Sequence, residues 1–333
     1  MRRRTVLRSL GMGLAGGSPT ISLEALRQGL GQTLDADHDG WRTVVVEYGH
    51  AYYTTPPARL GEQLAADLAL LQQMIDAETG VRRFRLMATA SQLATLLAMA
   101  LAATGQRHVA ARWRSSAQLA AARSQHTDAV VFVGTWAVVN GCYHHQSLAP
   151  LIERAEKTIA LTGDRVDATV AGLHAGHAQA LALAGRPHEA ELALRRVAQA
   201  TERMPADILA DASSVFGWPE HRLRHTESLV YTHTGRFAAA EAAQDRAISL
   251  YPPSQSRLRA QVLLHRATGM VKAGDVSTGV RYAVDVLDQL PRALHTANLH
   301  EVARQVVANV VDAKGHRADI ADLNERVASG PAV

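Results

Sequence analysis

The sequence has a single cysteine, Cys142, and few aromatic residues. Only 5% of its 333 residues are aromatic, whereas 47% are hydrophobic. Alanine, leucine and valine must therefore fill the core, which is typical of closely packed helix pairs. One cysteine excludes a disulfide framework and fits a reducing compartment. We therefore expect a helical protein of the cytoplasm.

A long apolar run and a compact basic patch are also missing. No stretch of eighteen apolar residues occurs, so we expect no membrane-spanning segment. The net charge is +4, but the arginines are spread along the chain, whereas a nucleic-acid surface needs a concentrated stripe. We expect no direct nucleic-acid binding by this chain alone. Residues 1–30 form a basic N-terminal arm, in which residues 3–8 resemble a twin-arginine motif, and export is the weaker alternative.

The sequence offers little for catalysis or metal binding. No Gly-x-Ser-x-Gly elbow, phosphate loop or dinucleotide fingerprint is present. The groups that invite a metal or a nucleophile are His174 with His177, His221 with His225, and Cys142 with His144 and His145. Neither helical pair has a visible third ligand, and neighbours in a turn rarely have triad geometry. We therefore predict no catalytic residue, no cofactor and no metal site.

The stretch from Asp35 to Glu47 superficially resembles a calcium-binding loop. Three alternating aspartates precede Gly40. An EF-hand loop needs a glutamate at position 12, but that position is Val46 and Glu47 comes one residue late. We expect the aspartates to precede and cap a helix whose apolar stripe begins at Trp41.

Repeated helix pairs dominate the rest of the chain. Turn glycines are followed five residues later by a small residue, in the pairs Gly105 with Ala110, Gly185 with Ala190, Gly235 with Ala240, and Gly274 with Gly279. A degenerate unit has Gly141 in its turn. Such spacing is that of tetratricopeptide repeats. We predict an all-α fold over residues 31–333, a right-handed superhelical solenoid of antiparallel helix pairs.

Three segments, Glu47 to Leu71, Phe216 to Arg236 and Ala247 to Asp275, resemble the C-terminal sensor region of actinobacterial XRE-type transcriptional regulators. Those proteins carry a lambda-repressor-like helix-turn-helix, a basic linker and then tetratricopeptide repeats. The RRRTVLRSLG opening is similar to their linker. The segment Ser22 to Leu34 is too short and glycine-rich to replace the helix-turn-helix. The resemblance implies sensing by the helical array rather than autonomous DNA reading.

The repeat phase predicts a ligand groove on the concave face. Positions thirteen, ten and six residues before each turn glycine are predicted to point inward. Trp136 and Asn140 flank these positions, and Trp218 comes from the loop that precedes Arg222. The predicted groove residues are Gln92, Asp128, Thr135, Trp136, Asn140, Gln179, Trp218, Arg222, His225 and Gln261. Amides, hydroxyls and apolar groups together suit a peptide, a small molecule or a protein partner. A non-enzymatic sensor is expected; an assembly scaffold without a small ligand remains the alternative, and a homodimer is compatible with the sequence.

Overall fold

The computed structural model describes residues 38–143, 147–312, 314–328 and 330, and within these ranges every regular element is a helix. The all-α prediction is therefore confirmed. The helices are α3 (His38–Thr54), α4 (Pro57–Ala77), α5 (Gly80–Ala103), α6 (Arg107–Arg123), α7 (Thr127–Gly141), α8 (Leu148–Ile159), α9 (Ala168–Leu183), α10 (Pro187–Glu202), α11 (Ala206–Ala210), α12 (Glu220–His233), α13 (Phe237–Leu250), α14 (Ser256–Lys272), α15 (Val276–Gln289), α16 (Ala297–Ala308) and α17 (Arg317–Ala328), with short 3-10 turns η1 (Pro253–Gln255), η2 (Arg292–Leu294) and η3 (Lys314–His316).

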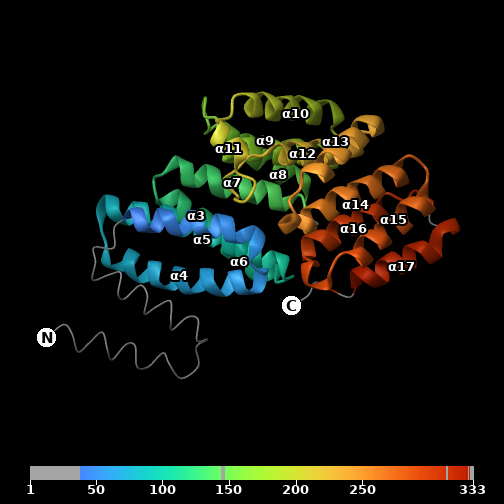
Figure 1. Ribbon diagram of the computed structural model, residues 1–333. Helices are drawn as coiled ribbons and strands as arrows, with labels where there is room; N and C mark the ends of the chain where they lie inside the picture. Colours follow the sequence, from blue (N-terminus) through green and yellow to red (C-terminus); the bar gives the residue numbers. More distant parts are fainter. Residues whose placement is uncertain (1–37, 144–146, 313, 329, 331–333) are drawn as a thin grey trace, which may run out of the picture.

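Successive helices pack as hairpins in two rows (Figure 1). The inner row is α5, α7, α9, α12, α14 and α16, each of which contacts the next. The second helix of each hairpin, α6, α8, α10, α13, α15 or α17, packs behind its partner. Helix α16 also contacts α5, and Arg107 lies 3.5 Å from Glu301. The last inner helix therefore meets the first, and the inner row surrounds a central space.

Four turns between paired helices share one backbone geometry. Their glycines, Gly105, Gly185, Gly235 and Gly274, have φ between 71° and 101°. In each turn the residue after the glycine donates its N–H to the carbonyl five residues earlier, as Arg236 does to Tyr231. This arrangement is a Schellman motif, in which a left-handed residue lets the chain satisfy the last carbonyls of a helix. Because a side chain disfavours that conformation, the sequence keeps glycine there.

The small residue five positions after each turn glycine lies where paired helices touch. Ala110, Ala190 and Ala240 are buried. A Cβ at Gly279 would stand 2.8 Å from the carbonyl oxygen of Ala267 on α14. The spacing read from the sequence thus marks the closest approach within each hairpin.

Gly141 departs from the pattern, contrary to its predicted place in a turn. It is the last residue of α7 and lacks the positive φ of the other four. A Cβ there would lie 2.5 Å from Cδ1 of Leu151 on α8. Gly141 is therefore required by the close packing of two helices, not by a turn.

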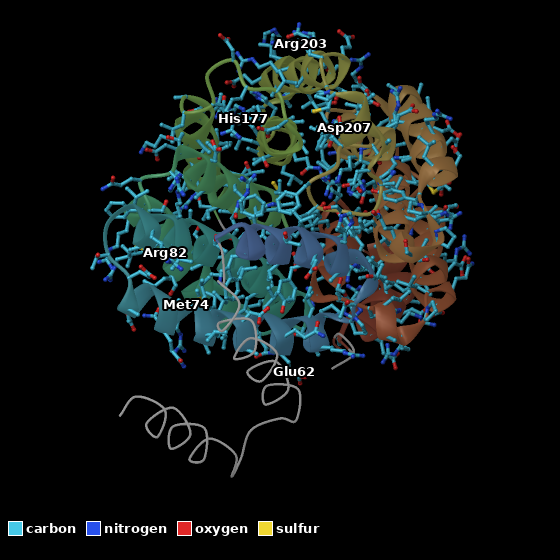
Figure 2. The ribbon with its side chains drawn as sticks, turned by 60° about the vertical axis from the view of Figure 1, so that its left-hand side comes forward. Glu62, Met74, Arg82, His177, Arg203 and Asp207 are labelled. Carbon is cyan, nitrogen blue, oxygen red and sulfur yellow. The ribbon has the colours of Figure 1, made fainter. Side chains whose placement is uncertain are left out.

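Helix α3 lies outside the hairpin pattern and bridges distant parts of the chain. Figure 2 shows it running across the middle of the molecule. The N–H of Val215 donates to the carbonyl of Gly49 at 3.1 Å, and Arg257 donates to the carbonyl of Tyr52 at 2.8 Å. The helix thus ties the N-terminal hairpins to the loop before α12 and to the start of α14.

The stretch from Asp35 to Glu47 that resembles a calcium-binding loop is largely helical, because residues from His38 onward belong to α3. A continuous helix cannot wrap around an ion as an EF-hand loop does. Trp41 and Val45 are buried, as the helical spacing of the apolar residues predicts. Asp35 and Asp37, like the basic arm 1–30 with its twin-arginine-like residues, lie outside the described residues.

Helix α5 is the one helix in the described ranges that is long and apolar enough to cross a membrane. Within the fold, 72% of its apolar window is buried. It packs against α3, α4, α6 and α7. Its composition therefore matches that of a central helix in a helical array.

Candidate functional site

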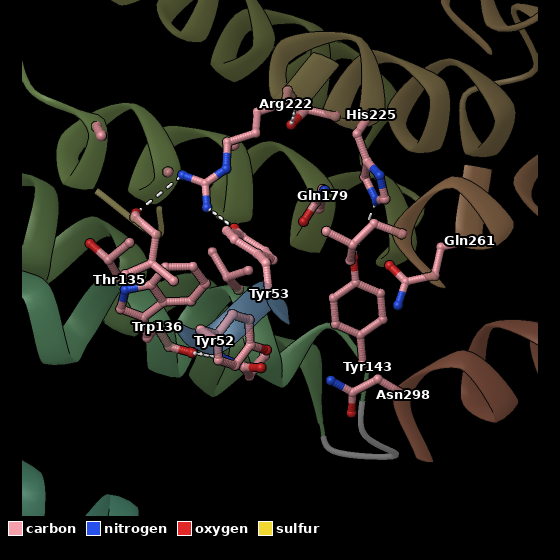
Figure 3. A pocket seen from close by; sticks show the side chains of 18 of the residues that line it. Tyr52, Tyr53, Thr135, Trp136, Tyr143, Gln179, Arg222, His225, Gln261 and Asn298 are labelled. Atoms are coloured by element: carbon pink, nitrogen blue, oxygen red, sulfur yellow. Dashed lines mark hydrogen bonds between the residues drawn. The ribbon is translucent and has the colours of Figure 1, made fainter. Parts of the chain in front are cut away.

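A cavity of about 140 Å³ lies inside the inner row (Figure 3). Helices α7, α9, α12, α14 and α16 form its walls, and the C-terminal end of α5 touches it at Ala103. Tyr52 and Tyr53 of α3 and Val215 and Trp218 of the loop before α12 cover it. The bridging helix and the loop therefore turn an open concave face into a partly enclosed site.

Small residues on one face of helix α9 make room for the cavity. Ala168, Gly172, Ala175 and Gln179 all line it. Their spacing of four, three and four residues puts them in one stripe along the helix. Because three of the four side chains are absent or a single methyl group, the facing helices cannot fill the gap.

Arg222 enters the cavity from the first turn of α12. Its Nη1 donates to the carbonyls of Val215 at 3.2 Å and Gly217 at 2.5 Å, and its Nη2 donates to the hydroxyl of Tyr53. The guanidinium carbon lies 5.8 Å from the ring centre of Tyr53. It lies 5.8 Å from that of Trp218 and 6.0 Å from that of Trp136, distances at which a cation is attracted to the ring face.

Gly217 allows the loop before α12 to present these carbonyls. A Cβ at Gly217 would lie 1.8 Å from the carbonyl oxygen of Asp211. Asp211 in turn accepts the N–H groups of Ser213 and Ser214 at 3.0 and 3.1 Å. The tight loop therefore sets the position of the carbonyls that hold Arg222.

His225, one turn beyond Arg222, joins a buried aromatic network. Its Nδ1 lies 2.8 Å from the hydroxyl of Tyr251, and its Nε2 lies 3.5 Å from the hydroxyl of Tyr143. The ring of His265 is 5.1 Å away. Burial lowers the pKa of His225 to about 4, with the nearby His221 and Arg222 acting in the same direction. The ring is therefore neutral at pH 7.

Amide side chains line the part of the cavity opposite the loop. Gln179 is only 4% exposed, and its Oε1 has no hydrogen-bond partner in the described part of the chain. Oδ1 of Asn298 on α16 is likewise buried without a partner. Gln261 on α14 also lines the cavity, on the right-hand side of Figure 3. A buried polar atom without a partner is costly, so a hydrogen-bond donor that displaces the lining side chains and reaches either oxygen would be stabilising.

Eight of the ten predicted groove residues line this one cavity: Thr135, Trp136, Asn140, Gln179, Trp218, Arg222, His225 and Gln261. Gln92 and Asp128 do not. Helix α5 reaches the cavity only at Ala103, eleven residues after Gln92 and therefore roughly 16 Å farther along the helix. Asp128 is at the start of α7, where it is exposed and pairs with Arg165 at 2.6 Å.

Repeat counting missed the residues that complete the cavity. They are chiefly Tyr52, Tyr53, Tyr143, Tyr251, Arg257 and Asn298. Tyr52 and Tyr53 precede the first repeat, so the repeat spacing does not predict where their side chains point. The adjacent tyrosines were a usable signal, because aromatic residues are scarce in this chain.

Of the side chains considered for catalysis or metal binding, His225 lines the cavity and Cys142 is buried. Burial raises the pKa of the Cys142 thiol to about 12, so it stays protonated at neutral pH. No group of three or more potential metal ligands occurs in the described residues. His144 and His145 lie outside those residues.

Comparison with family models, curated proteins and solved structures found no match to this chain.

Proposed function

We propose that this chain is a non-catalytic binding protein that senses a ligand inside its helical array. The supporting observation is the cavity, which combines two arginines, buried amides without partners and aromatic rings in one partly enclosed space. Ligand sites commonly combine apolar walls with a few convergent polar groups in this way. In this proposal the array is a right-handed, tetratricopeptide-like superhelix, and the repeated glycine turns and small contact residues support that assignment.

The shape of the site favours a small molecule over a peptide or a protein partner. A peptide lying along the concave face would meet α3, which is fixed there by hydrogen bonds from Val215 and Arg257. The space beneath α3 is about 140 Å³, which is comparable to an engineered cavity of roughly 150 Å³ that binds benzene. The resemblance to XRE-type regulators supports a place in cytoplasmic transcriptional regulation, with DNA contacted by another polypeptide or domain.

Thermal denaturation of the purified chain with a library of small metabolites tests the proposal. A ligand that binds only the native state raises the melting temperature, by an amount that grows with its concentration relative to Kd. The variant Gly172→Leu fills the cavity, since a Cβ at Gly172 meets Thr135 at an ordinary contact distance of 3.4 Å. We expect this variant to lose the ligand effect, whereas Ala242→Leu, at an exposed position of α13, retains it.

Stabilisation that persists in Gly172→Leu would place the ligand outside the cavity and contradict the proposal. A screen in which no small molecule stabilises the chain would favour an assembly scaffold instead.

A further inference from the structure

We infer that the ligand of this cavity is a small monocarboxylic acid with a ring-sized apolar body and an uncharged hydrogen-bond donor at its far end. The inference rests on the proposed function, because it names the chemical class that the same cavity takes. Its three parts follow from the charge of the cavity, from the edge that Arg222 presents and from the two amide oxygens without partners.

The cavity carries positive charge without a compensating acid. Arg222 and Arg257 line it, and no aspartate or glutamate does. Neither arginine forms an ion pair within the described residues, whereas Arg165, Arg246 and Arg326 each pair with a carboxylate. Charges interact more strongly in a partly enclosed, aromatic-lined space than in water. An anionic ligand group would therefore provide the missing countercharge.

Arg222 is already oriented to receive a carboxylate. Two backbone carbonyls and the Tyr53 hydroxyl hold Nη1 and Nη2, whereas Nε has no hydrogen-bond partner in the described part of the chain. Elsewhere in this protein an arginine Nε takes part in binding an acid: Arg246 donates to Glu220 from Nε at 2.9 Å and from Nη2 at 2.6 Å, whereas Nη2 of Arg222 already donates to Tyr53. A held guanidinium loses less entropy when it binds a planar carboxylate.

One carboxylate fits better than a phosphate. A phosphate presents more acceptor oxygens and favours several converging donors or a helix N-terminus. Here Nη2 of Arg257 donates to the carbonyl of Tyr52, and the guanidinium lies over the Tyr52 ring at 5.3 Å. Its charge adds to the field beside Nε of Arg222. The rings of Trp136 and Trp218 beside Arg222 provide apolar contact for the ligand body.

The far end of the ligand is set by Gln179 and Asn298. Each has a buried amide oxygen that lacks a hydrogen-bond donor among the described residues. Because no carboxylate lines the cavity, a ligand ammonium group would be left without a countercharge. A hydroxyl or amide N–H would satisfy these oxygens without adding positive charge.

Isothermal titration of the full chain with 4-hydroxyphenylacetate tests the inference against three matched probes. These are its carboxamide, which removes the charge; phenylacetate, which removes the donor; and tyramine, which replaces the acid by an ammonium group. We expect the hydroxy acid to bind at least tenfold more tightly than the carboxamide, and tyramine to bind least. Quenching of tryptophan fluorescence gives an independent readout, because Trp136 and Trp218 lie at the site.

Two variants separate recognition from folding. Arg222→Gln should weaken binding of the hydroxy acid at least tenfold, whereas Arg246→Gln, on α13 and outside the cavity lining, should leave the affinity unchanged. Arg222 also holds the loop before α12, so Gln179→Leu provides a second test that leaves the loop intact. It should reduce affinity for the hydroxy acid but not for phenylacetate.

Equal affinity for the acid and its carboxamide would overturn the inference. So would an absence of acid binding. If neutral molecules from the library then bind in a manner sensitive to Gly172→Leu, the proposed function stands and only the ligand class is wrong. If neither acids nor neutral molecules bind, both proposals fail.

Discussion

The glycine-turn hairpins and the segments that cover the cavity obey different rules. The hairpins repeat one turn geometry and one small contact residue, so each unit depends only on local sequence. Helix α3 and the loop before α12 have no counterpart in the repeat and are held by contacts that span more than 160 residues, such as the 3.1 Å contact between His50 and Ser213. The hairpins therefore form the wall of the cavity, and α3 together with the loop before α12 covers it.

The largest effect of a single substitution is expected where the irregular loop is tightest. Gly217→Ala places a methyl group 1.8 Å from the Asp211 carbonyl oxygen, so the backbone must move. That movement displaces the carbonyls that hold Arg222. We expect a loss of about 3 kcal/mol in unfolding free energy, at the upper end of overpacking costs. Urea denaturation measures it; an unchanged midpoint would mean that the loop is not tightly constrained.

Lowering the pH should reduce the stability of the inner helices around the cavity. Burial lowers the pKa values of His221 and His225 to about 4 and that of His265 well below its ordinary value. The unfolded chain protonates these rings below about pH 6.5, while the native chain does not. Stability should therefore be complete above pH 6.5 and fall as the pH drops toward 4. For His225 alone the loss is on the order of 2–3 kcal/mol.

Thermal melts across this pH range check the effect in the wild type and in His225→Gln. The variant should show a shallower dependence on pH, whereas substitution of the exposed His108 should leave the curve unchanged. Parallel curves for wild type and His225→Gln would contradict the assignment of this loss to the inner helices.

The regular hairpins can be disturbed at their contact residue. Ala240 is 2% exposed on α13. Ala240→Leu places a four-carbon side chain in a close helix contact and should lower the free energy of unfolding by about 1–3 kcal/mol. Ala242→Leu, on the exposed face of the same helix, serves as the control. Equal melting temperatures for the two variants would mean that the small position does not mark the helix contact.

This contrast explains what the sequence could and could not predict. Positive φ at Gly105 or Gly274 and burial at Ala190 follow from local spacing, because a turn and its neighbouring contact lie within a few residues. Eight of the groove residues fall on the cavity for the same reason. Tyr53 and Arg257 meet the cavity through long-range packing of α3 and α14, which no repeat period encodes. Gln92 does not line the cavity, because equal repeat positions do not stay equally close to a cavity along an array.

The smallest effect distinguishes the two kinds of glycine. Gly235 has φ of 78° and open space around its missing Cβ, so Gly235→Ala should cost about 1 kcal/mol through backbone conformation alone. Asparagine tolerates this conformation better, so Gly235→Asn should cost less than Gly235→Ala. At Gly141 the obstacle is Leu151, 2.5 Å from an added Cβ, so the larger asparagine should cost more than alanine. Chemical denaturation of the four variants tests the reversed order. The same order at both glycines would show that Gly141 belongs with the regular turns after all.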